Sequence, residues 1–250
     1  IDKGIAVTKR IGLRGASITQ HPEFDELLTW LDQDNFDDMR LSLSSVRATT
    51  VNKKMTRLLS RRNCKSITIA IESGSQKIRE LVNKKLTEEE IYSAARYAHE
   101  GGLSKLKLYG MVGLHKETEE DIEITAELLL KLKRKNPGLR LSFGVSTFVP
   151  KAHTPFQWFG VRSESKKRLQ MLGKRLRPHG IEVRPESYGW SVIQALISRS
   201  DRRLAPVIEL VRGSQNTLGG WKKAYKTIQE KNNSLMIHCE GCGILSKLEK

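Results

Sequence analysis

The chain has 250 residues, of which 38% are hydrophobic and 29% charged, a composition typical of a folded globular protein. No stretch approaches the roughly 18 consecutive apolar residues of a membrane-spanning helix, so we expect no membrane span. The formal net charge is +16, from 44 Lys and Arg against 28 Asp and Glu. A basic surface can serve nucleic acid, an acidic membrane or an anionic substrate. We favour the alternative that the excess lies on solvated, lysine-rich helix faces, and nucleic acid stays open as a partner.

The three cysteines do not form a disulfide framework. Cys64 stands alone in mid-chain, and Cys239 and Cys242 form a CxxC near the C-terminus. This usage predicts a reducing compartment, so we expect a cytoplasmic protein. A lone CxxC offers two or three ligands, short of a four-ligand zinc site, and we therefore predict no metal site within the chain. An auxiliary iron–sulfur or zinc site completed by other ligands is the alternative.

Segments typical of strands and of helices alternate up to about residue 150. Apolar alternation predicts strands at 7–16, 39–46, 65–71, 105–113 and 140–149. Helical periodicity predicts helices at 24–31, 52–62, 76–82, 87–99 and 118–135. Thr87-Glu-Glu-Glu90 is typical of a capping box at the start of the fourth of these helices.

After residue 150 the pattern is mainly helical. We expect helices at 163–176, 189–199, 203–212 and 218–230, with one short strand at 181–184. Strands joined by crossover helices pair in parallel, which predicts an α/β fold. Five strand–helix units are too few for a complete eight-unit barrel of about 250 residues, so the fold is a partial barrel or an open sheet. In either fold the ligand lies at the C-terminal ends of the strands.

Four of the five predicted strand ends carry small or polar residues. Glu72-Ser73-Gly74-Ser75 offers a carboxylate and hydroxyls that could bind a ligand's hydroxyl and amino groups; a helix N-cap is the alternative, which we favour less. Gly110 and Gly113 permit close approach of the backbone, or simply form the turn, while Glu117 complements the following helix. Arg47 could bind a carboxylate, and a surface arginine is the alternative.

Five segments in this order carry a resemblance to a known family. They are 11–23 (IGLRGASITQHPE), 41–48 (LSLSSVRA), 69–76 (IAIESGSQ, with Ile78-Arg79 and Val82-Asn83-Lys84 after it), 109–121 (YGMVGLHKETEED) and 147–158 (TFVPKAHTPFQW). Together they resemble the strand ends of the radical S-adenosylmethionine (SAM) superfamily, and most closely its cobalamin-domain-associated group.

The resemblance implies a partial (β/α)6-type TIM barrel that lacks its first strand, over residues 1–160. A mainly helical C-terminal region at 161–231 and a tail with the CxxC at 232–250 would follow. It also implies reductive cleavage of SAM at a [4Fe–4S] cluster, an electron donor as partner, and radical chemistry on an unknown substrate. Cobalamin is allowed as a further cofactor, for methyl transfer. No catalytic residue is assigned, and the SAM-contacting residues implied by the matching positions are Ser17, Arg47, Glu72, Ser73, Gly74, Gly110, Gly113, Glu117 and Val149.

Two departures from the family pattern bear on this interpretation. No cysteine precedes Cys64, so the CxxxCxxC loop that holds the cluster is absent. We expect that loop upstream of Ile1, in a longer enzyme of which this chain is an inactive portion. His115 stands where the family usually has proline, which loosens the turn. The alternatives are a basic nucleic-acid-binding or tRNA-modifying protein, and a non-catalytic remnant of the family.

Overall fold

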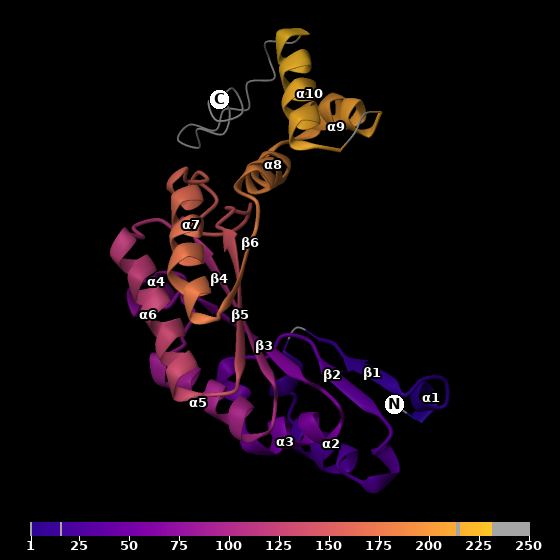
Figure 1. The fold of residues 1–250 in the computed structure, drawn as a ribbon. Coiled ribbons are helices and arrows are strands. Elements are labelled where there is room, and N and C mark those ends of the chain that lie inside the picture. Colours follow the sequence, from indigo (N-terminus) through magenta and orange to yellow (C-terminus); the bar gives the residue numbers. More distant parts are fainter. Residues whose placement is uncertain (1, 16, 214–215, 232–250) are drawn as a thin grey trace. The chain divides into compact units, whose positions relative to one another are not determined.

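The computed structural model describes residues 2–15, 17–213 and 216–231 (Figure 1). Contacts divide the chain into two units. The barrel unit holds residues 1–110, 117–145 and 171–184, and the helical unit holds 111–116, 146–170 and the residues from 185 onward. The predicted domain boundary at residue 160 stays a prediction, and the tail with Cys239 and Cys242 lies outside the described residues.

The strands confirm the predicted α/β class and lie close to the expected positions. They are β1 (Arg10–Leu13), β2 (Arg40–Leu43), β3 (Ser66–Glu72), β4 (Lys105–Val112), β5 (Arg140–Thr147) and β6 (Glu182–Pro185). β1 pairs with β2 and β3 pairs with β4, both in parallel, and β3 to β6 form one sheet in the order β3-β4-β5-β6. β5 also runs parallel to β4, because the N–H groups of Arg140 and Phe148 donate to carbonyls 36 residues earlier, those of Ser104 and Val112. A single parallel bridge from Val46 to Ile69 links the chain after β2 to β3. The arrangement is consistent with a partial barrel.

The helices from α2 onward follow the sequence prediction, whereas α1 was not predicted. They are α1 (Asp2–Ile5), α2 (Phe24–Leu31), α3 (Lys53–Arg61), α4 (Gln76–Leu81), α5 (Glu88–Glu100), α6 (Glu119–Lys135), α7 (Glu164–Leu176), α8 (Tyr188–Arg199), α9 (Ala205–Arg212) and α10 (Leu218–Lys231). The capping box at Thr87 and Glu90 is confirmed, and Thr118 forms a second one with Asp121. Short 3-10 turns include η1 (Ile18–Gln20) and η3 (Ala48–Thr50).

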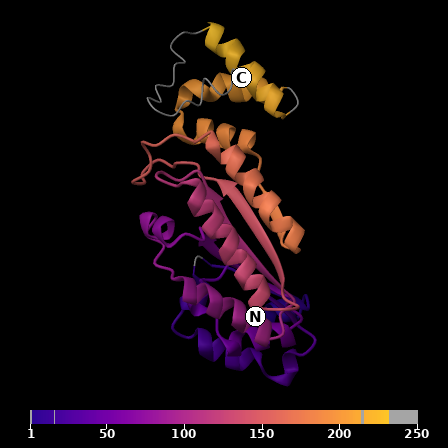
Figure 2. The ribbon, with the colours of Figure 1, turned by 60° about the vertical axis from the view of Figure 1, so that its left-hand side comes forward.

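The two faces of the central strands differ. Ile67, Ile69 and Ile71 of β3 and Leu106 and Leu108 of β4 are buried on one face. In Figures 1 and 2, α6 lies alongside the strands of the barrel unit. The intervening residues on the other face of β3 and β4 are half-buried or exposed, which is the pattern of a sheet packed against helices on one side.

The helical unit has a core of its own. It is built from α8, α9 and α10, with Leu196, Val207 and Trp221 among the buried side chains and Val149 packed against them. In the described part of the chain, no helix is both long and apolar enough to cross a membrane.

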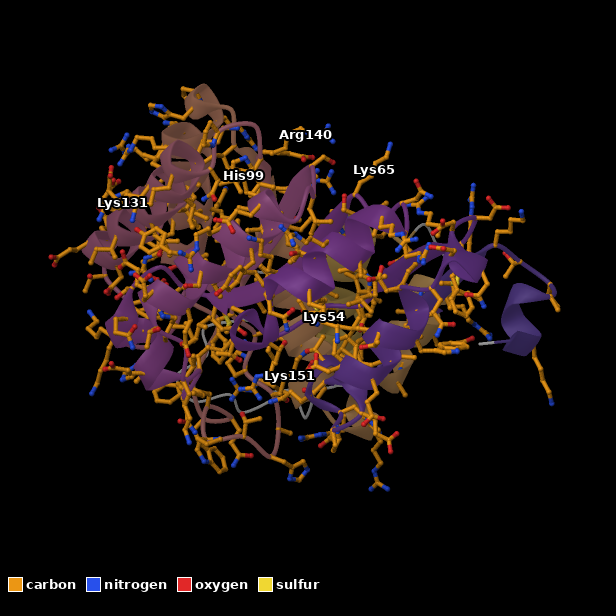
Figure 3. All side chains as sticks on the ribbon, turned by 90° about the horizontal axis from the view of Figure 1, so that it is seen from below. Lys54, Lys65, His99, Lys131, Arg140 and Lys151 are labelled. Atoms are coloured by element: carbon orange, nitrogen blue, oxygen red, sulfur yellow. The ribbon has the colours of Figure 1, made fainter. Side chains whose placement is uncertain are left out.

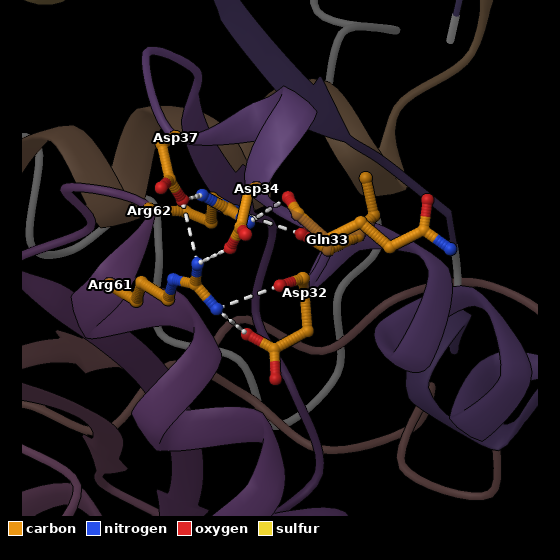
Figure 4. Close-up of polar contacts among 7 residues, drawn as sticks. Asp32, Gln33, Asp34, Asp37, Arg61 and Arg62 are labelled. Carbon is orange, nitrogen blue, oxygen red and sulfur yellow. Dashed lines mark hydrogen bonds and ion pairs between the residues drawn. The ribbon is translucent and has the colours of Figure 1, made fainter.

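An arginine–aspartate cluster joins the end of α3 to the loop before β2 (Figure 4). The cluster consists of Arg61, Arg62, Asp32, Asp34 and Asp37. Arg62 is fully buried, and its guanidinium donates to the carbonyls of Leu31 and Gln33 as well as to the carboxylate of Asp37. Because burying an unpaired charge is costly, these acceptors are what allow an arginine in this position.

Candidate ligand-binding site

A cavity of about 280 Å³ lies in the barrel unit where β2 and β3 end. This volume is just below the roughly 300–1,000 Å³ of typical small-molecule sites. Its polar lining residues are Ser17, Ser45, Arg47, Thr49, Lys84 and Lys85, and the remaining lining residues, such as Val46 and Ala70, are apolar. The structure therefore brings Ser17 and Arg47, two predicted contact residues, to one cavity wall.

Hydrogen bonds between the two 3-10 turns position this wall. The hydroxyl of Thr50 donates to that of Thr19 at 2.7 Å, which joins η3 to η1. The guanidinium of Arg47 donates to the side-chain oxygen of Gln20 at 3.3 Å. Segments distant in the sequence are thereby held around a cavity with three cationic side chains and no acidic one in its lining. Such a lining suits a ligand that carries an anionic group.

The end of β3 is irregular. The register of β3 against β4 shifts between Ala70 and Glu72, and Glu72 has φ +63°. Asn83 and Lys85, on the loop that supplies the cavity lining, also have positive φ values of +53° and +42°. The Glu72 carboxylate accepts a hydrogen bond from Lys84 at 2.8 Å. Backbone strain of this kind persists only where the surrounding structure enforces it, and it clusters at functional sites.

Arg79 holds the same loop in place and was not predicted from the sequence as a site residue. Its buried guanidinium donates to the carbonyls of Ser73, Gly74 and Leu86, each at 2.8 Å. Burial lowers the pKa of Arg79 from its ordinary value. The sequence signal that could have indicated a buried Arg79 is its position next to Ile78, on the buried side of a short helix. Lys84, although part of the family match, and Lys85 were also not predicted as contact residues, because a charged loop usually indicates only solvent exposure.

Ser73 and Gly74 face α6 rather than the cavity. The Gly74 N–H donates to the hydroxyl of Thr125 at 2.9 Å, and the Ser73 hydroxyl lies 3.3 Å from that same oxygen. A Cβ atom on Gly74 would lie 2.3 Å from the Cα of Thr125. These two predicted contact residues therefore pack the β3–α4 turn against α6, and neither lines the cavity.

The other predicted contact residues are divided between the units. In the barrel unit, Gly110 lies beside the end of β3, where an added Cβ would be 2.8 Å from the Glu72 carbonyl oxygen, and Glu117 is buried just before α6. In the helical unit, Gly113 has φ +88°, and Val149 packs on the core. The structure thus brings Ser17 and Arg47 to the cavity wall and Glu72 to the lining residue Lys84, with Gly110 beside Glu72. Contact of the whole predicted set with SAM stays a prediction.

Tyr109 is an exposed aromatic side chain on the half-buried face of β4. It is 52% exposed and lies over Gly144 of β5, where an added Cβ would be 2.7 Å from the Tyr109 ring. Its backbone partner on β3 is Ala70, which lines the cavity. Tyr109 was not singled out from the sequence, because an aromatic residue in a strand is most often part of the core.

A site at the C-terminal ends of parallel strands defines a class of α/β ligand-binding proteins, and comparison with known proteins narrows that class. The family model of the Radical SAM superfamily matches residues 4–129, half of the chain, and the chain belongs to that superfamily.

Two curated relatives are similar in sequence. The chain is 32% identical over 224 residues to an uncharacterized protein of Methanocaldococcus jannaschii, covering 89% of this chain and 49% of that protein. It is 30% identical over 89 residues to an uncharacterized methyltransferase of Pyrococcus horikoshii, covering 36% of this chain and 19% of that protein. The chain thus spans at most about half the length of these relatives.

Among solved structures, coproporphyrinogen III oxidase from Escherichia coli, described as a radical SAM enzyme, is similar at a TM-score of 0.44. The identity is 18%, and the match covers 68% of this chain and 39% of that chain.

The family implies SAM and a [4Fe–4S] cluster, and the described residues fit the two groups differently. Cys64 is buried with its thiol toward the Ser66 carbonyl at 3.2 Å, and no group of three metal-binding side chains occurs among the described residues. The described part of the chain therefore does not fit a cluster. Its cavity matches two parts of SAM, because it offers cations for the carboxylate and hydroxyls for the ribose. Next to the lining residue Ser45, the hydroxyl of Ser44 is buried and has no hydrogen-bond partner among the described residues.

Proposed function

We propose that this chain forms the SAM-binding part of a radical SAM enzyme. The observation that carries the proposal is the cavity at the ends of β2 and β3, within the residues that the family model matches. Arg47 and Lys85 would hold the methionyl carboxylate, and Ser17 and Ser45 would bind hydroxyl groups. When bound at its cluster, SAM supplies the radical chemistry, and the protein supplies binding and orientation.

We further propose that the cysteine ligands of the cluster belong to a part of the enzyme outside this sequence. Two facts support this: the chain contains no CxxxCxxC motif, and it spans 49% of the M. jannaschii relative. The isolated chain, incubated with iron and sulfide, is then expected to show no cluster absorption band and no turnover. A stable band would contradict this proposal.

Methyl transfer is the reaction class that we propose for the whole enzyme, on a substrate still to be found. One relative is described as a methyltransferase, and the sequence resembles the cobalamin-associated group. An electron donor is the expected partner. SAM-dependent methylation by the full-length enzyme, with and without cobalamin, tests both points. Turnover that leaves the methyl group of SAM untransferred would exclude methyl transfer.

SAM binding by the chain itself is the direct test of the site. Isothermal titration calorimetry with SAM should detect binding, and Arg47→Ala should weaken it by about 10- to 100-fold, because a charge-assisted hydrogen bond contributes about 1.5–3 kcal/mol. Arg57→Ala, at an exposed arginine of α3, is the matched control and should bind as the wild type does. Equal binding by both variants would refute the site, and failure of the full-length protein to bind SAM would favour the non-catalytic alternative.

A further inference from the structure

The first five strands each begin with, or directly after, a basic residue. These residues are Arg10, Arg40, Lys65, Lys105 and Arg140, all in the barrel unit. Arg10 and Arg40 are paired across β1 and β2. The Lys65 carbonyl accepts the N–H groups of Ser104 and Lys105, each at 3.1 Å, and the Arg140 N–H donates to the Ser104 carbonyl at 3.1 Å. Arg10 and Arg40 therefore lie side by side at the start of one sheet, and Lys65, Lys105 and Arg140 follow one another at the start of the other.

Acidic side chains neutralise only part of this charge. Of the five residues, Lys105 pairs with Glu182 at 2.6 Å. The nearby carboxylate of Asp38 pairs with Lys9, which is not one of the five, also at 2.6 Å. The aspartates of the arginine–aspartate cluster are occupied by Arg61 and Arg62.

Four cations are left over, and we call them the basic edge: Arg10, Arg40, Lys65 and Arg140. All four are exposed and make no ion pair with the described residues. In Figure 3, which views this end of the barrel unit, Lys65 and Arg140 project outward near each other.

The negative ends of the helix dipoles do not account for the basic edge. Helices that alternate with parallel strands end at this same side, and a helix C-terminus favours cations within its own last turn. The last turns of α3 and α6 carry their own cations, Arg61 and the run Lys133, Arg134 and Lys135. The basic edge lies on strand ends, so its charge is additional.

The basic residues lie in rows along the strand starts and do not form a round patch. Neighbouring strands of one sheet lie about 4.8 Å apart, so Arg10 and Arg40 form one pair, and Lys65, Lys105 and Arg140 form a row of about 10 Å. A linear row of cations suits a linear polyanion, whose successive phosphates it can neutralise. Among the described residues, the exposed tyrosine and tryptophan rings are those of Tyr109, Trp158 and Trp190, and none of them is at the start of a strand. The strand starts therefore carry no exposed tyrosine or tryptophan ring on which a base could stack.

We propose that the basic edge binds the phosphate backbone of a nucleic-acid strand, without sequence preference. Contacts to phosphate position a protein on nucleic acid and carry no sequence information. This surface lies at the opposite ends of the strands from the cavity, and the proposal does not depend on SAM binding.

The test measures how binding depends on salt. Fluorescence anisotropy with a labelled oligouridylate 12-mer gives log K against log[NaCl] for the wild type and for a variant with Arg40→Gln, Lys65→Gln and Arg140→Gln. Each phosphate contact on a single strand contributes about 0.7 to the slope, so the triple variant should be shallower by about two. The single variants, each expected to change the slope by about 0.7, serve if the triple variant does not fold.

A charge-matched control separates the edge from general basicity. The triple substitution of Lys222, Lys223 and Lys226 to Gln on α10 removes the same charge from the helical unit and should leave the slope unchanged. An equal or larger change in this control overturns the proposal, as does absence of oligonucleotide binding by the wild type. Equal competition by polyglutamate overturns it in favour of an acidic protein partner. The edge variant should bind SAM as the wild type does.

Discussion

Replacing Arg62 with alanine should destabilise the barrel unit by about 3–5 kcal/mol. Its side chain is 0% exposed, and it donates to the carbonyls of Leu31 at 2.8 Å and Gln33 at 2.6 Å. Each carbonyl left without a donor costs about 1–3 kcal/mol, and the packing of the aliphatic stem is lost as well. The sum falls in the range of about 3–5 kcal/mol measured when one partner of a buried ion pair is removed.

Arg61 is the matched control, because it is the neighbouring residue of the same helix and binds the same loop. Its side chain is 41% exposed, and its partners are the carboxylates of Asp32, Asp34 and Asp37 and the backbone carbonyl of Asp32 at 2.7 Å. Exposed ion pairs contribute at most about 1 kcal/mol and are screened by salt. Arg61→Ala should therefore cost far less than Arg62→Ala, and less still in 1 M NaCl.

Thermal unfolding followed by circular dichroism compares the two variants. One kcal/mol shifts Tm by about 2–4 °C in a domain of 150–250 residues, so Arg62→Ala should lower Tm by about 6–20 °C and Arg61→Ala by less than about 4 °C. The hydrogen bond from Arg62 lowers the pKa of Asp37 below 3.8. The stability that Asp37 adds is therefore present above about pH 4 and is lost as pH falls through the lowered pKa, and Arg62→Ala should weaken this dependence. Equal Tm shifts for the two variants would refute the reasoning.

Two other changes test the packing of α6. A Cβ on Gly74 would lie 2.3 Å from the Cα of Thr125, more than 1 Å inside an ordinary contact of 3.4 Å, so Gly74→Ala should cost about 1–3 kcal/mol in urea unfolding. Gly173 lies inside α7, and a Cβ there would be 3.5 Å from its nearest neighbour, the guanidinium of Arg177. Gly173→Ala should therefore stabilise the protein by about 0.5–1 kcal/mol. The opposite order of the two glycine variants would contradict this account. Asp121→Ala removes the Asp121 half of the capping box of α6 and the acceptor of the buried Ser75 hydroxyl, at a cost of about 2–4 kcal/mol. Burial by itself would raise the pKa of Asp121, but its hydrogen bonds lower it overall, so its contribution is present above about pH 4 and lost as pH falls through the lowered pKa. Tm measured from pH 5 to pH 3 should fall less steeply for this variant, and an unchanged slope would contradict the assignment.

The sequence by itself determined the order and the type of the elements. Alternation in β3 and β4 and helical periodicity in α5 and α6 reflect which side of each segment is buried, and that information is local. The capping box at Thr87 is local too, because its hydrogen bonds join residues three apart. Family membership could also be inferred, from the order of the strand-end motifs, and the match over residues 4–129 confirms it.

Only the tertiary structure decided which of the candidate residues meet. Ser17, Arg47 and Lys85 line one cavity, although they come from three separate segments of the chain. Ser73 and Gly74 have the same local pattern as a ligand-binding turn, yet they pack against α6. The two cases differ in what lies opposite each turn, and that depends on contacts between residues far apart in sequence. Propensity and periodicity report which face of an element is buried, but they carry no information about the element that buries it.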